Sequence, residues 1–223
     1  MQARQHENRG AQMAALRRLV EEKFPQAQPA APVRRLRTGC PFLDQKGGLR
    51  RGALTEICGS PAGGQIALAA LLERAREEGF FTGLIDAADA FAPTEWSETL
   101  LHRLLWVRCR QADLALKAAD YLLRDGNLPL LVLDLQLAPE KQLRRIPLST
   151  WHRFHRVIES SATVFVLLTP HPMVEGVAAR MALHTQPELL DMYRSRADLV
   201  RELNGNIFER GDAQDFTLLE KSA

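Results

Sequence analysis

Two kinds of hydrophobic pattern alternate along most of this chain. Short runs are apolar at nearly every position, and between them lie longer segments in which apolar residues recur every three or four positions. The first pattern is typical of strands buried on both faces of a sheet, and the second is typical of amphipathic helices. The runs predict strands at 53–58, 81–86, 105–108, 130–135, 163–169 and 181–185, and a strand or hairpin at 207–218. The periodic segments predict helices at 65–78, 94–104, 112–124, 148–160 and 187–203.

The order of these elements sets the expected fold class. Continuously apolar strands joined by helices predict an α/β fold, in which a mostly parallel sheet has helices on both faces. The chain has 223 residues, which is enough for one such domain and a short appendage. We therefore predict a single core domain at residues 34–223.

A further amphipathic helix is predicted at 12–24, ahead of the core. Its apolar face contains Met13, Leu16, Leu19 and Val20. Prolines at positions 25, 29 and 32 end this helix and favour an extended linker. Because an isolated helix of this length is marginal in water, it needs a surface to pack against. We predict that residues 1–33 form an arm, and that Leu16, Leu19 and Val20 pack on the core or bind a neighbouring molecule.

Composition and charge add little to this picture. Hydrophobic residues make up 46% of the chain and charged residues 25%, and the net charge is +2, all ordinary for a globular protein. No apolar run is long enough to cross a membrane, and the N-terminus has no signal-peptide core. The three cysteines, Cys40, Cys58 and Cys109, form no C-x-x-C pair. An odd number of unpaired cysteines favours a reducing, cytoplasmic location.

The candidate chemistry lies between the strand at 53–58 and the helix that follows it. The segment Gly59-Ser60-Pro61-Ala62-Gly63-Gly64-Gln65-Ile66 has the two glycines of a phosphate-binding loop, G-x-x-x-x-G-K-[ST], at the correct spacing. Gln65 replaces the lysine that neutralises the phosphates, and Ile66 replaces the hydroxyl that binds Mg²⁺. Phosphoryl transfer depends on positioning and charge stabilisation, so we expect ATP hydrolysis to be very slow or absent. The alternative is that the segment is only a tight turn between a strand and a helix.

Several segments, taken in order, resemble the ATPase core of RecA-type recombinases. They are Phe42–Gly59, which leads into the glycine-rich loop, Ile85–Pro93, Leu130–Asp134 and Thr163–Thr169. The resemblance implies that Asp134 stands where the family's Walker B aspartate assists the metal ion. It also implies that Ala88 stands where the family carries its catalytic glutamate. Together with Gln65 and Ile66, this departure implies a RecA-like fold that no longer hydrolyses ATP.

Within that superfamily the chain most resembles the ImuA-type accessory factors of bacterial SOS mutagenesis, on the segment Arg51-Gly52-Ala53-Leu54-Thr55-Glu56 and the eroded loop. The resemblance implies a non-catalytic adaptor in translesion DNA synthesis. Its implied partners are RecA, an error-prone polymerase-like protein and single-stranded DNA. Two alternatives stay open, namely a RecA-type DNA-dependent ATPase with an atypical loop and a SulA-like cell-division inhibitor. We expect no cofactor, although the glycines at 59, 63 and 64 and Ser60 leave weak nucleotide binding open.

A cluster of basic residues is the candidate DNA contact. It contains Arg144, Arg145, Arg153 and Arg156, and it is interspersed with Trp151 and Phe154. The resemblance places the family's first DNA-binding loop in this region, and arginines with aromatic rings suit single strands. The alternative is an amphipathic helix that buries its rings and leaves its arginines in water. No metal site is predicted, since neither a cysteine nor a carboxylate accompanies His152 and His155.

One short motif bears on self-association. Phe24-Pro25-Gln26-Ala27 has the form F-x-x-A. In some RecA-type recombinases this pattern inserts one subunit into the next, so the resemblance implies that Phe24 and Ala27 contact a neighbouring molecule. An apolar anchor on an extended linker is a sound physical means of docking.

Overall fold

The core of the molecule is one seven-stranded sheet. A computed structural model describes residues 34–185, 191 and 193–209, so the predicted arm at 1–33 lies outside the described residues. The strand order is β5-β4-β6-β7-β3-β8-β9. The strands are β3 (Ala53–Cys58), β4 (Thr82–Asp86), β5 (Leu104–Arg108), β6 (Leu130–Asp134), β7 (Val164–Thr169), β8 (Ala179–Leu183) and β9 (Gly205–Glu209). All neighbouring pairs are parallel except β8 and β9, which are antiparallel.

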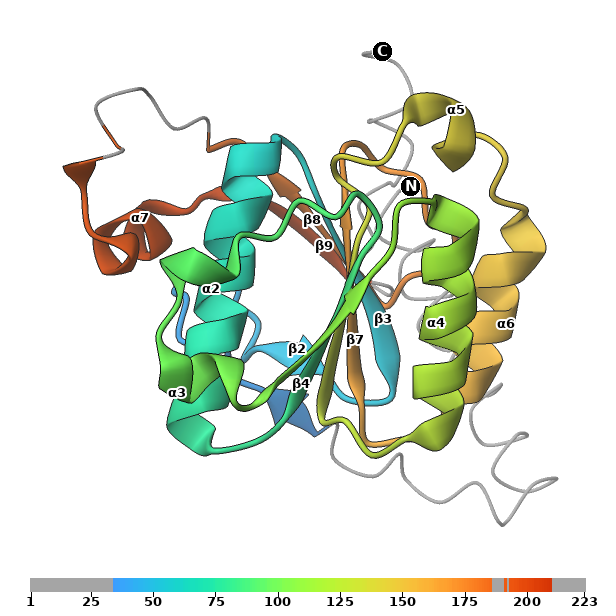
Figure 1. The fold of residues 1–223 in the computed structure, drawn as a ribbon, viewed down its shortest axis with the longest axis horizontal. Coiled ribbons are helices and arrows are strands. Elements are labelled where there is room, and N and C mark those ends of the chain that lie inside the picture. Colours follow the sequence, from blue (N-terminus) through green and yellow to red (C-terminus); the bar gives the residue numbers. More distant parts are fainter. Residues whose placement is uncertain (1–33, 186–190, 192, 210–223) are drawn as a thin grey trace, which may run out of the picture. The chain divides into compact units, whose positions relative to one another are not determined.

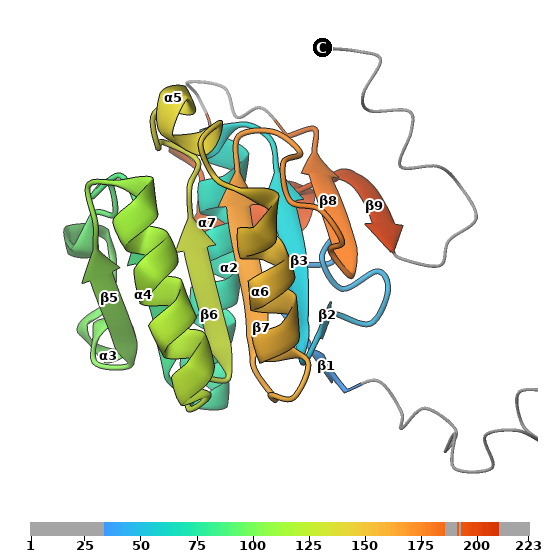
Figure 2. The ribbon, with the colours of Figure 1, turned by 90° about the vertical axis from the view of Figure 1, so that its right-hand side faces the viewer.

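Helices cover both faces of this sheet (Figure 1). One face carries α2 (Pro61–Glu78), α3 (Glu98–Leu101) and α7 (Arg196–Glu202). The other face carries α4 (Ala112–Asp125) and α6 (Leu148–Ile158), which lie side by side in Figure 2. The short helix α5 (Glu140–Leu143) lies beyond the end of β6. The predicted α/β fold with a mostly parallel sheet is thus confirmed.

The two layers of helices explain why the central strands are apolar at every position. In β7, Val164, Val166 and Leu168 pack into the core beneath α2, whereas Phe165 and Leu167 pack into the core beneath α4 and α6. Successive side chains of a strand point to opposite faces, so a strand buried on both faces needs apolar residues throughout. Each core contributes to the free energy of folding by removing apolar surface from water.

The helix predicted at 94–104 is wrong. In its place are a 3₁₀ turn, η1 (Pro93–Glu95), the four-residue helix α3 and the first residue of β5. Trp96 interrupts the helix because its backbone is extended, with φ −119° and ψ 151°. This conformation lets the Trp96 ring stack on Phe91, with ring centroids 5.8 Å apart. Aromatic packing has therefore overridden the helical periodicity.

The helix predicted at 187–203 is also too long. Ser195 is extended, with φ −68° and ψ 146°, and its side chain accepts a hydrogen bond from the Asp198 N–H. This is an N-cap, so α7 begins at Arg196. Positions 186–190 and 192 lie outside the described residues.

Smaller differences concern short elements and strand ends. The strand predicted at 181–185 is β8, two residues earlier, and the strand predicted from 207 is β9, which begins at Gly205. A two-stranded antiparallel sheet of β1 (Arg35–Leu36) and β2 (Leu49–Arg50) was not predicted. Strands of two residues are too short to show a hydrophobic period.

Within the described ranges, no helix is long and apolar enough to span a lipid bilayer.

Candidate functional site

The glycine-rich segment connects the carboxyl end of β3 to the first turn of α2. Gly59 turns the chain with φ 144°, a conformation that residues other than glycine rarely adopt. A Cβ at Gly59 would also lie 2.9 Å from the carbonyl oxygen of Leu183 in β8. The Gly59 N–H donates to the carbonyl of Thr169 at 3.2 Å. The first glycine of the loop is therefore required by strand packing, whether or not a phosphate binds.

The helix begins earlier than predicted and uses its own N-terminal donors. The predicted start at 65 is wrong, because α2 starts at Pro61, with Ser60 as its N-cap. The Ser60 Oγ accepts from the Gly63 N–H at 3.2 Å, and the Ser60 carbonyl accepts from the Gly64 N–H at 3.0 Å. Pro61 has no N–H. A phosphate at this helix N-terminus would therefore have to compete with Ser60 for two donors and would find none at Pro61.

Gln65 is bound to the aspartate that the metal would need. Its Nε2 donates to Asp134 Oδ2 at 3.1 Å, and the Gln136 backbone N–H donates to Asp134 Oδ1 at 3.0 Å. The pKa of the Asp134 carboxyl is raised to about 6, mainly by burial and also by the neighbouring Asp86, against the two hydrogen bonds, which lower it. Ile66, in the position of the Mg²⁺-binding hydroxyl, is buried in the core beneath α2. Gln65 and Ile66, which stand where the motif has its lysine and its hydroxyl, thus both contact other parts of the protein.

The second carboxylate of the site, that of Asp86, accepts hydrogen bonds from two backbone N–H groups and one indole N–H. Asp86 ends β4 and stands opposite Asp134 in the register of β4 and β6. Its side chain accepts from the Ala88 N–H at 3.2 Å, the Phe91 N–H at 2.8 Å and the Trp106 Nε1 at 3.4 Å. These bonds hold the connection that follows β4, which is a structural role. At Ala88 itself there is no acidic group to activate water.

Gln136 is the residue of this site that sequence reasoning missed. Its side chain is 5% exposed, and its Nε2 donates to the Ser60 carbonyl at 3.3 Å. A Cβ at Gly64 would overlap the amide group of Gln136, so the two residues are in close contact. The available signal was a lone amide between Leu135 and Leu137, directly after a buried strand.

The predicted DNA-binding arginines are divided between two places. Arg145 lines a cavity at the start of α4, with Gln111 and Asp113. Arg153 and Arg156 line another cavity near the end of α4, together with Arg124. Arg144 pairs with Glu140 at 2.8 Å, and Arg153 pairs with Asp120 at 3.0 Å.

The aromatic rings near these arginines face inward. Trp151 is 1% exposed and Phe154 is 0% exposed, and both pack in the core beneath α4 and α6. Base stacking requires an exposed ring face. Any DNA contact by α6 would therefore rest on its arginines alone.

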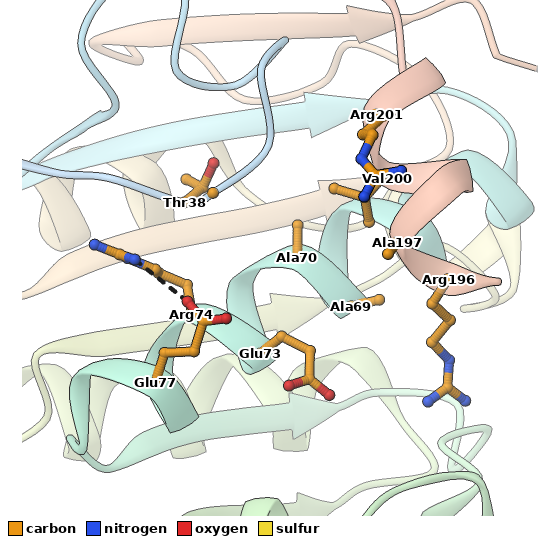
Figure 3. A pocket seen from close by; sticks show the side chains of 11 residues that line it. Thr38, Ala69, Ala70, Glu73, Arg74, Glu77, Arg196, Ala197, Val200 and Arg201 are labelled. Carbon is orange, nitrogen blue, oxygen red and sulfur yellow. Dashed lines mark hydrogen bonds and ion pairs between the residues drawn. The ribbon is translucent and has the colours of Figure 1, made fainter.

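A pocket of about 400 Å³ lies against the second half of α2 and beside α7 (Figure 3). Its arginines are engaged by the protein, since Arg74 pairs with Glu77 at 3.3 Å, Arg201 pairs with Asp198 at 2.7 Å, and Arg196 lies 4.2 Å from the centroid of the Trp96 ring. None of the predicted nucleotide-site residues lines this pocket.

The remaining predicted residues lie outside the described part of the chain. The candidate partner-binding residues are Leu16, Leu19, Val20, Phe24 and Ala27, all in the segment 1–33 that the structure does not describe. Over the described positions, no group of three or more histidine, cysteine, aspartate or glutamate side chains could hold a metal ion.

Comparison with known proteins gives a limited match. No protein-family model matches the chain. Over 120 residues it is 32% identical to Protein RecA of Chlorobium chlorochromatii (strain CaD3) and 32% identical to Protein RecA of Chlorobaculum parvum (strain DSM 263 / NCIMB 8327). Each match covers 50% of this chain and 34% of the relative, so the chain spans about a third of the length of the curated relatives it matches. The similarity supports a RecA-like relationship over half of the chain, in agreement with its α/β fold.

Proposed function

We propose that this chain is a non-catalytic, RecA-like adaptor in the bacterial SOS response, acting in translesion DNA synthesis as an ImuA-like component. It binds RecA or an error-prone polymerase-like protein, with single-stranded DNA as an additional ligand. The observation that carries the proposal is the hydrogen bond from Gln65 to Asp134, at 3.1 Å. A neutral amide occupies the place where an ATPase of this fold needs a lysine beside its metal-binding aspartate.

The groups around that bond support the same conclusion. Phosphoryl transfer relies on cations that neutralise the developing charge and on a group that orients the attacking water. Here Ile66 is buried in the core, and Ala88, which has no acidic group, stands where the catalytic base would be. The Gly63 and Gly64 N–H groups already bind Ser60. Each part of the hydrolytic machinery is thus missing or committed to the fold.

The proposal is tested by measuring ATP turnover by the purified chain, with and without single-stranded DNA, beside an active RecA. We expect no DNA-stimulated turnover. A rate comparable to that of RecA would contradict the proposal. Pull-down with RecA and with a polymerase-like protein tests the adaptor role, and the absence of binding to both would contradict that role.

A second candidate function is a RecA-type DNA-dependent ATPase to which a neighbouring subunit supplies the missing cation. The retained carboxylate of Asp134 at the end of β6 favours it, because such a group serves metal binding in the family that the sequence resembles. The same turnover assay, repeated at rising protein concentration, distinguishes the two functions. Turnover that appears only on assembly would support this second candidate.

A further inference from the structure

The side chain of Gln136 crosses from the end of β6 to the first turn of α2. Gln136 follows the last residue of β6, Asp134, by two positions, and it is 5% exposed. Its Nε2 donates to the Ser60 carbonyl at 3.3 Å, and Ser60 is the N-cap of α2. Its backbone N–H donates to Asp134 at 3.0 Å. The residue is therefore held at both ends, by the strand and by the helix cap.

The amide group of Gln136 occupies the space directly over Gly64. A Cβ built at Gly64 would overlap all three outer atoms of that amide, which are Cδ, Oε1 and Nε2. In a working phosphate-binding loop, the backbone N–H groups of the glycine-rich segment must be open to the phosphate oxygens. Here a side chain of the same protein fills the space.

The contact is not an ordinary piece of core packing. Among the residues that the structure describes, Gln136 Oε1 has no hydrogen-bond partner, although the atom is buried. An apolar side chain of similar length would fill the same space without an unsatisfied acceptor. The buried amide of Gln136 thus makes one hydrogen bond, to the N-cap of α2, and leaves one acceptor unsatisfied beside the first turn of that helix.

We propose that Gln136 is a built-in plug that excludes nucleotide phosphates from the N-terminus of α2. The inference rests on the proposed non-catalytic function and extends it. Loss of nucleotide binding then has two independent causes, namely the missing cation at Gln65 and hydroxyl at Ile66, and the steric block by Gln136. Restoring the lysine and the threonine alone is insufficient, and the side chain after β6 decides whether a nucleotide enters.

The test compares three variants of the full chain. The first restores the loop with Gln65→Lys and Ile66→Thr. The second adds Gln136→Ala, which empties the space over Gly64. The third adds Gln136→Met instead, which keeps the volume of the plug and removes its amide. Binding of ATP with Mg²⁺ is measured by isothermal titration calorimetry, and circular dichroism with a thermal melt checks that each variant is folded.

We expect the alanine variant to bind ATP at least tenfold more tightly than the loop-restored variant. The methionine variant should bind as weakly as the loop-restored variant, since it still blocks the site. Equal affinity of the alanine and loop-restored variants, including no binding by either, would overturn the plug. Binding by the methionine variant as tight as that of the alanine variant would overturn its steric basis.

A second measurement keeps the inference testable if the restored loop does not fold. When Gln136→Ala is already present, Gly64→Ala should raise the melting temperature, because alanine is favoured over glycine within a helix. In the otherwise unchanged chain the same substitution should raise it less or lower it, because the new methyl group must displace the amide of Gln136. Equal effects of Gly64→Ala in both backgrounds would show that Gln136 does not occupy this space.

The two proposals fail in different experiments. ATP turnover by the unchanged chain would refute the non-catalytic function, whatever the variants do. Tight ATP binding by the loop-restored variant would refute the plug, while the unchanged chain would still be inactive.

Discussion

Asp134 keeps a carboxylate at the end of β6, beside a loop that no longer carries a cation. Its oxygens accept hydrogen bonds from Gln65 and from the Gln136 N–H. Two neutral donors stabilise an ionised carboxylate less than a lysine or a metal ion does. Burial therefore dominates and raises the pKa of this group to about 6. At the scale of single residues, the fold thus tolerates a carboxylate whose ionised form is disfavoured by burial.

This raised pKa predicts a pH dependence of stability. The ordinary pKa of 3.8 applies in the unfolded chain, and the pKa is about 6 in the folded one. Between these values the folded state binds the proton more tightly, so the free energy of unfolding falls as pH rises from about 4 to about 6. Asp134→Asn should remove this slope and stabilise the protein above pH 6, by at most about 3 kcal/mol at about 1.4 kcal/mol per pKa unit.

Urea unfolding of both proteins at several pH values measures this effect. The matched control is Asp125→Asn, at an exposed position at the end of α4, which should leave the slope in place. If the Asp134→Asn variant has the same pH dependence as the unchanged chain, the raised pKa is wrong.

At the scale of elements, the hydrophobic pattern predicted those strands and helices whose buried positions follow a regular period. The strand 53–58 and the helix 112–124 were predicted almost to the residue, because β3 is buried at every position and α4 has one buried stripe. The helix predicted at 94–104 is wrong because the ring stack of Phe91 and Trp96 that interrupts it is a tertiary contact with no sequence period. The early start of α2 was not predicted, although Ser60 and Pro61 are residues that commonly begin helices.

The connection between β7 and β8 is held by a buried hydrogen-bond network that only the structure shows. Glu56 of β3 is fully buried and accepts from the Met173 N–H at 2.8 Å and the Val174 N–H at 3.2 Å. Arg180 of β8 pairs with the same carboxylate at 2.6 Å. A buried charge of this kind is retained where it is paired and hydrogen-bonded. The network ties this connection to the sheet, whereas the hydrophobic pattern of the sequence predicts only the strands on either side of it.

The helix α6 carries the prediction on DNA binding. Since Trp151 and Phe154 are buried, binding would depend on arginine contacts to phosphate, which weaken steeply with salt. The variant Arg153→Ala/Arg156→Ala should weaken binding of single-stranded DNA and reduce the slope of log K against log salt by about 1 for each phosphate that the variant no longer binds. Arg76→Gln, in the last turn of α2 on the opposite face of the sheet, is the matched control. Fluorescence anisotropy over a salt series is the measurement, and identical curves for the unchanged chain and the double variant would exclude α6.

At the scale of the whole molecule, residues of the glycine-rich segment also serve the packing of the fold. Gly59 is needed for the approach of β8, Gly64 for the contact with Gln136, and Ile66 for the core. A sequence can therefore keep the glycine spacing of a phosphate-binding loop for reasons of packing alone. The glycine motif by itself therefore leaves open whether the segment binds a phosphate. The deciding residue, Gln136, lies more than seventy positions away from the loop's first glycine, and only the sheet brings the two together.

The predicted arm supplies the last test, because both hydrophobic cores are built from described residues between Leu36 and Ile207. Because both cores can be described without residues 1–32, we expect a chain that begins at Val33 to fold and to melt close to the temperature of the full chain. It should nevertheless lose the apolar face formed by Leu16, Leu19 and Val20. An isolated helix is marginal in water, so this face needs a neighbouring surface to pack against. We expect weaker self-association by light scattering or weaker capture of RecA in a pull-down. A full-length Leu16→Ser/Leu19→Ser variant should reproduce the loss if the apolar face is responsible. Unchanged scattering and unchanged capture by the shortened chain would show that the docking surface lies on the core itself.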